Sequence, residues 1–275
     1  MAQGIRAFMK ATRRLSIVLV WAVSLGATLA AGLAAAPQGQ DLDAARALYD
    51  RGVMLKAAEL ARGFGTADGH ALAAQATLVA AVYQTPGRPA GRLLRQAADD
   101  ARAALAIDPD HLQAHLRLVV ALGYIAEANP IDAHFAGLAH EGKALLDRAL
   151  ALAPDSAWAH GLLGVWHLRI VRHAGPMLAE SLYAASLEQG RAHCEEAANL
   201  APEILAVRFG CAIALLEADP RRYTEEALET LDTVARLPAE DAAAQLIRAD
   251  ARHRLDAIRS GAREGSGEVL GGGRH

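Results

Sequence analysis

Three segments of the chain align without gaps, and each carries a proline at the same position between two amphipathic stretches. The segments are ALAIDPDHLQAH (104–115), ALALAPDSAWAH (149–160) and AANLAPEILAVR (197–208). Proline is tolerated at the first position of a helix, because its missing N–H would have no partner there anyway. Each segment therefore predicts the end of one helix and the start of the next, and together they predict a series of helix pairs.

The composition favours helices throughout. Hydrophobic residues make up 53% of the chain but aromatic residues only 4%, and no recurrent run of valine, isoleucine or threonine is typical of a strand. Much of the hydrophobic fraction is alanine, whose small side chain suits closely packed helices. We therefore expect an all-α fold in which antiparallel helix pairs stack into a solenoid over residues 41–258.

Proline and glycine residues divide this domain into expected helices. Their ranges are 42–62, then 68–84 with 91–107, 110–128 with 133–153, 155–173 with 180–200, 203–217 with 222–236, and finally 239–258. The remainder, residues 259–275, is rich in glycine and poor in apolar side chains. We expect a disordered tail there.

The first 36 residues differ from the rest of the chain in charge. They hold four basic residues and no acid, so that 28 − 4 = 24 basic residues remain against 31 acidic ones, a net charge of −7. A mildly acidic body without basic clusters lacks the positive surface that nucleic-acid binding needs. We therefore expect no nucleic-acid partner.

The same residues carry a targeting signal. A basic start followed by an apolar stretch at 17–36, which ends in small residues, is typical of a signal peptide spanning residues 1–36. The alternative is an uncleaved anchor in the inner membrane, because twenty apolar residues can just span a bilayer. This segment would then be the contact with the membrane. In both cases we expect the helical domain outside the cytoplasm, in the periplasm or otherwise exported.

The proline-centred segments resemble the tetratricopeptide repeat (TPR), which has an alanine five residues before the proline and a helix with a leucine–glycine pair, here Leu163-Gly164. The resemblance covers residues 41–258 and implies a right-handed solenoid whose concave face receives a peptide or protein. With a degraded copy at 234–241, the prolines lie 45, 48 and 36 residues apart, against about 34 in the standard repeat. The extra residues at 172–190, with LLGVWHLRIV before them, are more similar to the divergent repeats of the regulator of microtubule dynamics family and its bacterial relatives.

Histidines are the first candidates for a metal site. His160 and His167 lie seven residues apart, which separates them by about 10 Å along a helix, too far to bind one ion whose ligands all lie within about 2.1 Å. His173 points to another face. His111 and His115 have the i, i+4 spacing that can reach one ion, but the glutamate of the zinc-hydrolase motif HExxH is absent. We expect no metal, no cofactor and a structural role for these histidines.

The two cysteines, Cys194 and Cys211, lie eight residues before and nine residues after Pro202. If that proline marks a turn between antiparallel helices, the thiols lie at nearly equal height, and an oxidising compartment would favour a disulfide. Helix axes, however, lie about 8–10 Å apart, whereas a disulfide needs Cα atoms within about 7 Å. Two small buried hydrophobic side chains are therefore the alternative.

The sequence indicates binding rather than catalysis. It contains no nucleophile elbow and no clustered acid–base set, so we expect no enzyme. The leading expectation is an exported scaffold that binds a peptide or protein. One face of the helix at 155–173 combines aromatic, aliphatic and arginine side chains, which is typical of binding hot spots. The candidate partner-binding residues on this face are Trp158, Leu162, Val165, Arg169 and Arg172.

Two alternatives stay open. Trp158 and Trp166 can be packing residues of the core instead of contacts to a partner. A different function is that of a periplasmic small-molecule-binding protein or transporter accessory, with a ligand cavity in the helical stack. A deep apolar cavity would favour that function, whereas an open, shallow groove would favour the scaffold.

Overall fold

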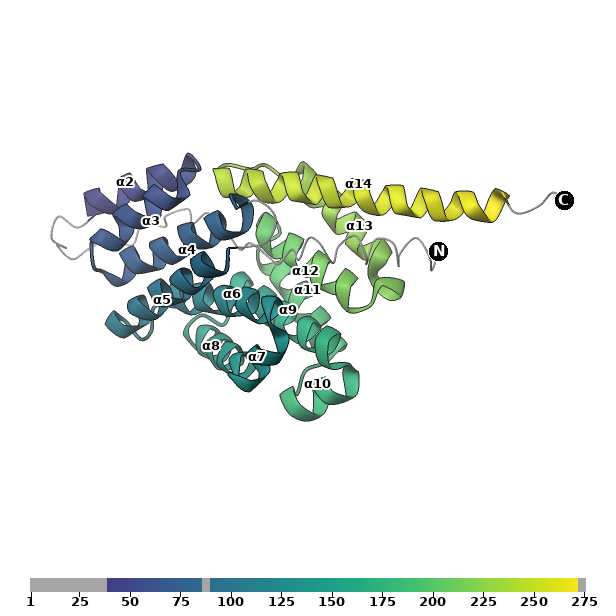
Figure 1. Cartoon of the computed structure of the whole chain (residues 1–275), viewed down its shortest axis with the longest axis horizontal. Coiled ribbons are helices and arrows are strands. Elements are labelled where there is room, and N and C mark those ends of the chain that lie inside the picture. Colours follow the sequence, from purple (N-terminus) through teal and green to yellow (C-terminus); the bar gives the residue numbers. More distant parts are fainter. Residues whose placement is uncertain (1–38, 86–89, 272–275) are drawn as a thin grey trace.

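The computed structural model describes residues 39–85 and 90–271, which form thirteen helices and no strand (Figure 1). The all-α prediction is therefore confirmed for this part of the chain. The helices are α2 (Gly39–Asp50), α3 (Met54–Gly63), α4 (Ala67–Tyr83), α5 (Gly91–Ile107), α6 (Leu112–Ala128), α7 (Pro130–Phe135), α8 (Leu138–Leu152), α9 (Ala157–Ala174), α10 (Pro176–Tyr183), α11 (Leu187–Leu200), α12 (Leu205–Ala218), α13 (Pro220–Arg236) and α14 (Ala242–Gly271). None of these helices is both long and apolar enough to cross a membrane. The predicted signal peptide or anchor at 1–36 lies outside the described residues.

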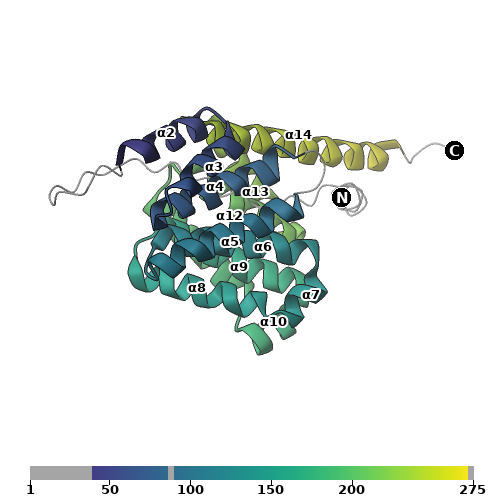
Figure 2. The same cartoon turned by 60° about the vertical axis from the view of Figure 1, so that its left-hand side comes forward.

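The longer helices pack as pairs. α4 packs against α5, α6 against α8, α9 against α11, and α12 against α13. The first helices of successive pairs also contact one another, since α6 packs on α4 and on α9, and α9 packs on α12. α14 lies on α12 and α13 and also touches α2, so the two ends of the described array meet (Figure 1, Figure 2).

The core lies around the first helix of each pair. α4, α6, α9 and α12 are buried along most of their length and are apolar on nearly every side. Their partners α5 and α13 keep a polar face in solvent and bury a narrower apolar stripe, as amphipathic surface helices do.

α9 and α11 approach each other closely at two glycines. A Cβ atom added to Gly164 would lie 2.7 Å from Sγ of Cys194 and 2.7 Å from the carbonyl oxygen of Gly190. A Cβ atom added to Gly190 would in turn lie 2.7 Å from Cγ of Leu168. Because close-packed interiors do not tolerate contacts this short, the glycine of the leucine–glycine pair is required by packing.

Three expected helices are each divided into two, and the prediction of single helices there was wrong. The expected helix at 42–62 is interrupted at Gly52, which has φ +81°, and becomes α2 and α3. Gly137 (φ +69°) separates α7 from α8, and Ala184 (φ +51°) separates α10 from α11. These residues adopt the left-handed backbone conformation, which ends a right-handed helix.

The repeated prolines do not occupy the predicted first helical position. Pro109 lies in a turn, and α6 begins three residues later, after the N-cap residue His111, whose Nδ1 accepts a hydrogen bond from the N–H of Ala114 (3.1 Å). α9 begins in the same way, with Oγ of Ser156 accepting a hydrogen bond from the N–H of Ala159. A side chain that satisfies a free N–H of the first turn defines these helix starts.

Candidate functional site

A cavity of about 510 Å³ lies among the middle helices, with walls from α6, α7, α8, α9 and α10. Most of its lining is apolar, and the side chains include Val119, Leu122, Leu138, Leu162, Val165 and Ile170. Ligand-binding clefts commonly have volumes of about 300–1,000 Å³ and largely apolar walls with a few polar groups. The cavity therefore has the size and the lining of a binding site.

The two short helices α7 and α10 form the outer wall of this cavity. Each has a proline in its first turn, Pro130 in α7 and Pro176 in α10. Left-handed residues border them, with Gly175 (φ +78°) before α10, Ala184 after it and Gly137 after α7. α10 lies within residues 172–190, the segment of extra residues in the repeat pattern. This segment therefore supplies part of the cavity wall.

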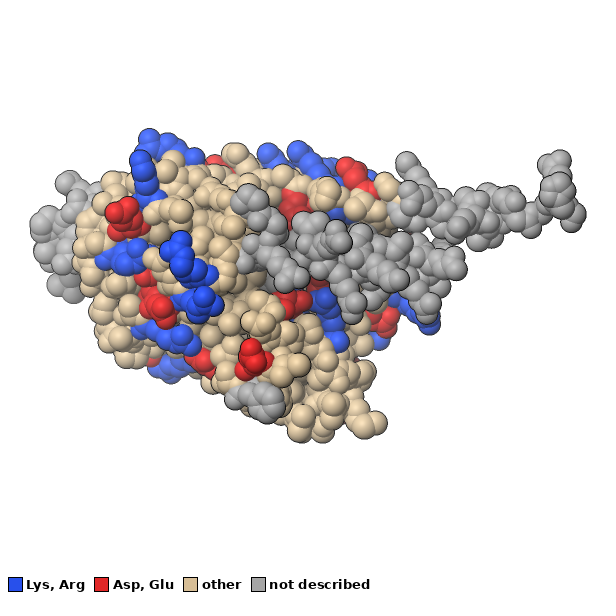
Figure 3. All heavy atoms as spheres, viewed as in Figure 1, with Lys and Arg blue, Asp and Glu red and all other residues tan. Residues whose placement is uncertain are grey.

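The apolar surface of the cavity includes exposed side chains of the same two helices: Ile131, Leu178 and Leu182 line the cavity, and Met177 lies next to Leu178 outside its lining. Ile131 of α7 is 74% exposed, and on α10 Met177 is 81%, Leu178 51% and Leu182 54% exposed. We call these four residues the apolar rim. In Figure 3 the lobe that holds α10 shows neither lysine nor arginine on the visible face. Contiguous exposed apolar side chains of this kind mark interaction sites.

One end of the cavity is charged, and opposite charges are paired there. Glu127 at the end of α6 accepts hydrogen bonds from Arg169 (2.8 Å) and Arg172 (3.1 Å), and its Oε2 lies 3.1 Å from Nε2 of His173. Arg172 also donates to Glu217 of α12 at 2.8 Å. Two guanidinium groups thus face two carboxylates, which joins α6, α9 and α12 at this end.

The pKa of Glu127 is set by these partners. Burial alone would raise it, but the hydrogen bond to His173 and the positive charges of Arg169 and Arg172 together lower it to about 2. Glu127 is therefore ionised at neutral pH.

Glu127→Gln is expected to lower the free energy of unfolding at pH 7 by about 2 kcal/mol, because Arg169, whose side chain is 11% exposed, loses its nearest carboxylate. The folded-state pKa lies below the ordinary value of 4.5, so the ionised carboxylate stabilises the fold above pH 4.5 and this contribution is lost as the pH falls towards 2. Urea unfolding of both proteins between pH 7 and pH 2 measures the effect. Equal stabilities at pH 7 would contradict it.

Tyr183 of α10 holds the outer wall of the cavity together. Its hydroxyl shares a hydrogen bond with Nδ1 of His134 on α7, at 2.6 Å. The ring of His140 on α8 also packs against Tyr183, with 5.0 Å between the ring centroids. These contacts keep α7, α8 and α10 together at one end of the molecule (Figure 2).

The structure divides the predicted partner-binding face of α9. Leu162, Val165 and Arg169 line the cavity, and Arg172 belongs to the charged end. Trp158 is 8% exposed and does not line the cavity; the guanidinium of Arg117 lies 5.9 Å from the centroid of its ring. Three of the five residues therefore meet at the cavity, whereas Trp158 packs in the core.

Other residues at the site were not predicted from the sequence. Trp166 lines the cavity and donates a hydrogen bond from Nε1 to the carbonyl oxygen of Ala139 (3.0 Å). The residues of α7 and α10 were not predicted either. A signal for these helices exists, because Pro130 and Pro176 are each followed directly by an apolar residue, Ile131 and Met177.

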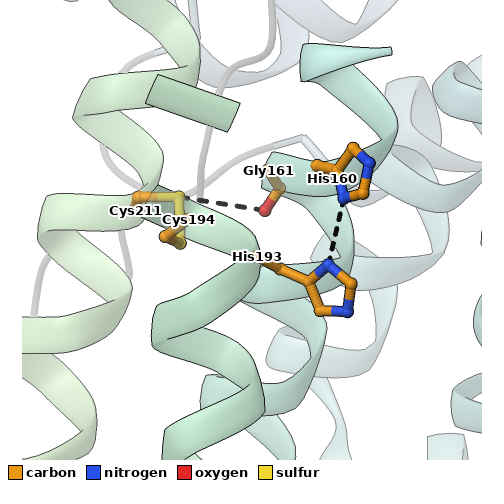
Figure 4. Close-up of a disulfide and its surroundings, with 5 residues drawn as sticks. All are labelled: His160, Gly161, His193, Cys194 and Cys211. Carbon is orange, nitrogen blue, oxygen red and sulfur yellow. Dashed lines mark hydrogen bonds between the residues drawn. A yellow bond between two sulfur atoms is a disulfide. The ribbon is translucent and has the colours of Figure 1, made fainter. Parts of the chain in front are cut away.

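The histidines of α9 pair with a histidine of α11. Nδ1 of His160 and Nδ1 of His193 share a hydrogen bond at 3.1 Å (Figure 4). The ring of His167 stacks on His193 with 5.8 Å between centroids. Burial, followed by the charges of His193 and Lys143, lowers the pKa of His167 to about 4, so this ring is neutral at pH 7. Among the described residues, no group of three or more histidine, cysteine or acidic side chains is arranged to hold a metal ion.

The candidate histidine pair at the start of α6 serves the turn before that helix. His111 caps the helix, and its Nε2 also lies 3.0 Å from Oδ1 of Asp68. Nε2 of His115 lies 2.8 Å from the carbonyl oxygen of Pro109. Both rings therefore have partners within the fold.

Cys194 and Cys211 form a disulfide between α11 and α12, with their Cα atoms 5.7 Å apart. The bond lies against α9, where Sγ of Cys211 is 3.9 Å from the carbonyl oxygen of Gly161 (Figure 4). Cys194 therefore takes part both in the disulfide and in the close contact of α11 with Gly164 of α9. The disulfide links the pair that contains the cavity wall to the next pair.

Comparison with known proteins relates most of the chain to one family. A family model described as Regulator of microtubule dynamics protein 1-3 matches residues 45–259, which include every helix that lines the cavity. No curated protein matches the chain.

Proposed function

The chain belongs to the regulator of microtubule dynamics protein 1-3 family, and we propose that this member is a non-enzymatic scaffold of the cell envelope that binds a peptide or protein partner at the cavity between α6 and α10. The partner places apolar side chains inside the cavity. It also contacts the apolar rim outside.

The observation that carries this proposal is the continuity of the cavity with the rim. A small molecule held in the cavity would leave the side chain of Met177 exposed, because Met177 lies outside the cavity lining. A peptide segment covers both surfaces at once, because it extends beyond the cavity while its side chains enter it. Burial of apolar area is the main favourable contribution to such association.

The cavity replaces the concave groove as the place where a partner binds. We propose a TPR-like, right-handed solenoid for the helix pairs, supported by the stacking of α4, α6, α9 and α12. These helices are largely buried, and α14 covers part of α12, with Arg254 lying 5.6 Å from the ring centroid of Phe209. The stacked helices α4, α6, α9 and α12 therefore offer a partner less accessible surface than the cavity and the apolar rim do.

The disulfide supports the export part of the proposal. Disulfides form and persist in oxidising compartments such as the bacterial periplasm, and they are rare in the cytosol. A bond between Cys194 and Cys211 therefore fits a protein that leaves the cytoplasm, with the residues before α2 as its signal peptide or membrane anchor.

A second candidate function is the binding of a small apolar molecule, as in a transporter accessory protein. The cavity volume of about 510 Å³ favours it, because this volume lies within the range of small-molecule sites. The two functions differ in whether the rim takes part.

Filling the cavity tests the proposed function. Gly123 of α6 lines the cavity, and a Cβ atom there would meet no atom of a neighbouring group within 4 Å, so Gly123→Leu places a side chain in open space. Gly63→Leu is the matched control, because Gly63 on α3 has the same open surroundings and lies outside the cavity lining. The probe is an uncharged amphipathic peptide of leucine and glutamine with about 14 residues, four helical turns.

We expect the wild-type protein and Gly63→Leu to bind this peptide with a change in the fluorescence of Trp166, and Gly123→Leu to bind at least tenfold more weakly. Circular dichroism checks that both variants are folded. Equal binding by all three proteins would contradict the proposal. If the peptide does not bind while anilinonaphthalene sulfonate binds the wild-type protein and not Gly123→Leu, the small-molecule function replaces it.

A further inference from the structure

We infer that the partner segment is a cationic amphipathic helix, whose apolar face enters the cavity and whose lysine or arginine residues lie over acidic groups at the rim. This inference rests on the proposed function and adds the chemistry of the partner to it. It is carried by the charges on α7 and α10 and by the shape of the surface between them.

The two segments that bear the rim, residues 128–142 and 174–190, carry acids and histidines but neither lysine nor arginine. Asp132 follows Ile131 on α7, and Glu180 lies three residues after Met177 on α10, on the helix face that carries Met177. Both acids are exposed, and neither forms a salt bridge with another residue in the described part of the chain. The two helices that bear the apolar rim thus carry two unpaired negative charges.

The basic groups nearest to the cavity do not offset these charges. Arg169 and Arg172 are paired with Glu127 and Glu217, so this end of the cavity has no excess positive charge from its arginines. An occupant therefore meets apolar surface flanked by net negative charge. Complementary charge guides the orientation of a partner and speeds its association.

The arrangement of the rim suits a helix. Ile131 of α7 and Leu178 and Leu182 of α10 line the cavity and are each more than half exposed, so the cavity opens beside these apolar side chains. An amphipathic helix fills an apolar groove with residues spaced three and four apart along one face. Basic side chains at the edges of that face would lie near the helices that carry Asp132 and Glu180.

The same charges argue against a membrane surface as the occupant. Anionic lipids attract clusters of lysine and arginine on a protein. The rim lacks such residues and carries acids instead. An apolar rim with acidic neighbours is therefore repelled by an anionic bilayer and attracted by a cationic peptide.

Two charged versions of the leucine peptide test the inference. The first peptide has lysine and the second glutamate at the positions that glutamine occupies in the neutral probe. We expect the leucine–lysine peptide to bind the wild-type protein at least tenfold more tightly than the leucine–glutamate peptide at low salt. The difference should shrink at 1 M salt, where the screening length is about 3 Å.

Charge removal at the rim gives the matched comparison. Asp132→Asn with Glu180→Gln should reduce the preference for the lysine peptide to less than threefold and leave binding of the neutral peptide unchanged. The control is Glu225→Gln with Glu229→Gln, which removes two exposed acids from α13 and should keep the full preference.

The outcomes separate this inference from the proposed function. Equal affinity for both charged peptides, or tighter binding of the glutamate peptide, overturns the cationic helix while neutral-peptide binding at the cavity still supports the scaffold. Binding of phosphatidylglycerol vesicles that is lost on replacement of Met177 and Leu178 by glutamine would also overturn it, in favour of a membrane surface. If added phosphatidylglycerol vesicles leave the binding of the leucine–lysine peptide unchanged, the inference of a cationic helix is supported.

Discussion

Replacing Gly164 by alanine is expected to lower the free energy of unfolding by about 3 kcal/mol, the upper part of the range for overpacked interiors. The added Cβ atom would lie 2.7 Å from both Sγ of Cys194 and the carbonyl oxygen of Gly190. Neither atom can move easily, because the first belongs to a disulfide and the second to the backbone of α11. α9 and α11 must therefore separate, which opens the packing along both helices.

The control is the same substitution at Gly123. There the Cβ atom meets open space, and alanine is favoured over glycine inside a helix by about 1 kcal/mol, so Gly123→Ala should be stabilising. Urea unfolding of the two variants thus gives changes of opposite sign. Equal stabilities would show that α9 and α11 are not in close contact at Gly164.

Removal of the disulfide is the second large effect. Cys194→Ala with Cys211→Ala is expected to lower the free energy of unfolding by about 3 kcal/mol, because the bond closes a loop with a sequence separation of 17 and restricts the unfolded chain. Thermal unfolding with and without a reducing agent measures it. The reductant should destabilise the wild-type protein and leave the double variant unchanged.

The thiol count of the purified protein is the check on this prediction. Alkylation of the denatured, unreduced protein should detect no free thiol, since both cysteines are in the bond. Two free thiols, together with a stability that does not respond to reductant, would contradict the account of α11 and α12.

Much of the fold was predictable because local signals mark the helix boundaries. The expected helix at 91–107 coincides with α5, and the expected helix at 68–84 differs from α4 by one residue at each end. Glycine and proline interrupt the amphipathic pattern at these points, and both ends of a helix depend on nearby residues. The first residues of the helices that follow the repeated prolines depend on capping side chains. The prolines alone predicted these first residues incorrectly.

The cavity was harder to predict because it depends on contacts between distant segments. α7 and α10 are too short to show a helical period, and the contact between His134 and Tyr183 joins residues 49 positions apart. Periodicity also shows which residues share a face of α9 but not which element covers that face. For this reason Trp158 was a candidate contact although it is buried, and Trp166 was interpreted as a packing residue although it lines the cavity.

The central claim is that a peptide partner binds at the cavity and its rim, and hydrogen–deuterium exchange of the protein with the leucine–lysine peptide tests it most directly. The account predicts slower exchange in α6, α7 and α10, with no change in α2 and α3, which lie away from the cavity. Slower exchange confined to α2, α3 or α14, with α7 and α10 unchanged, would contradict it.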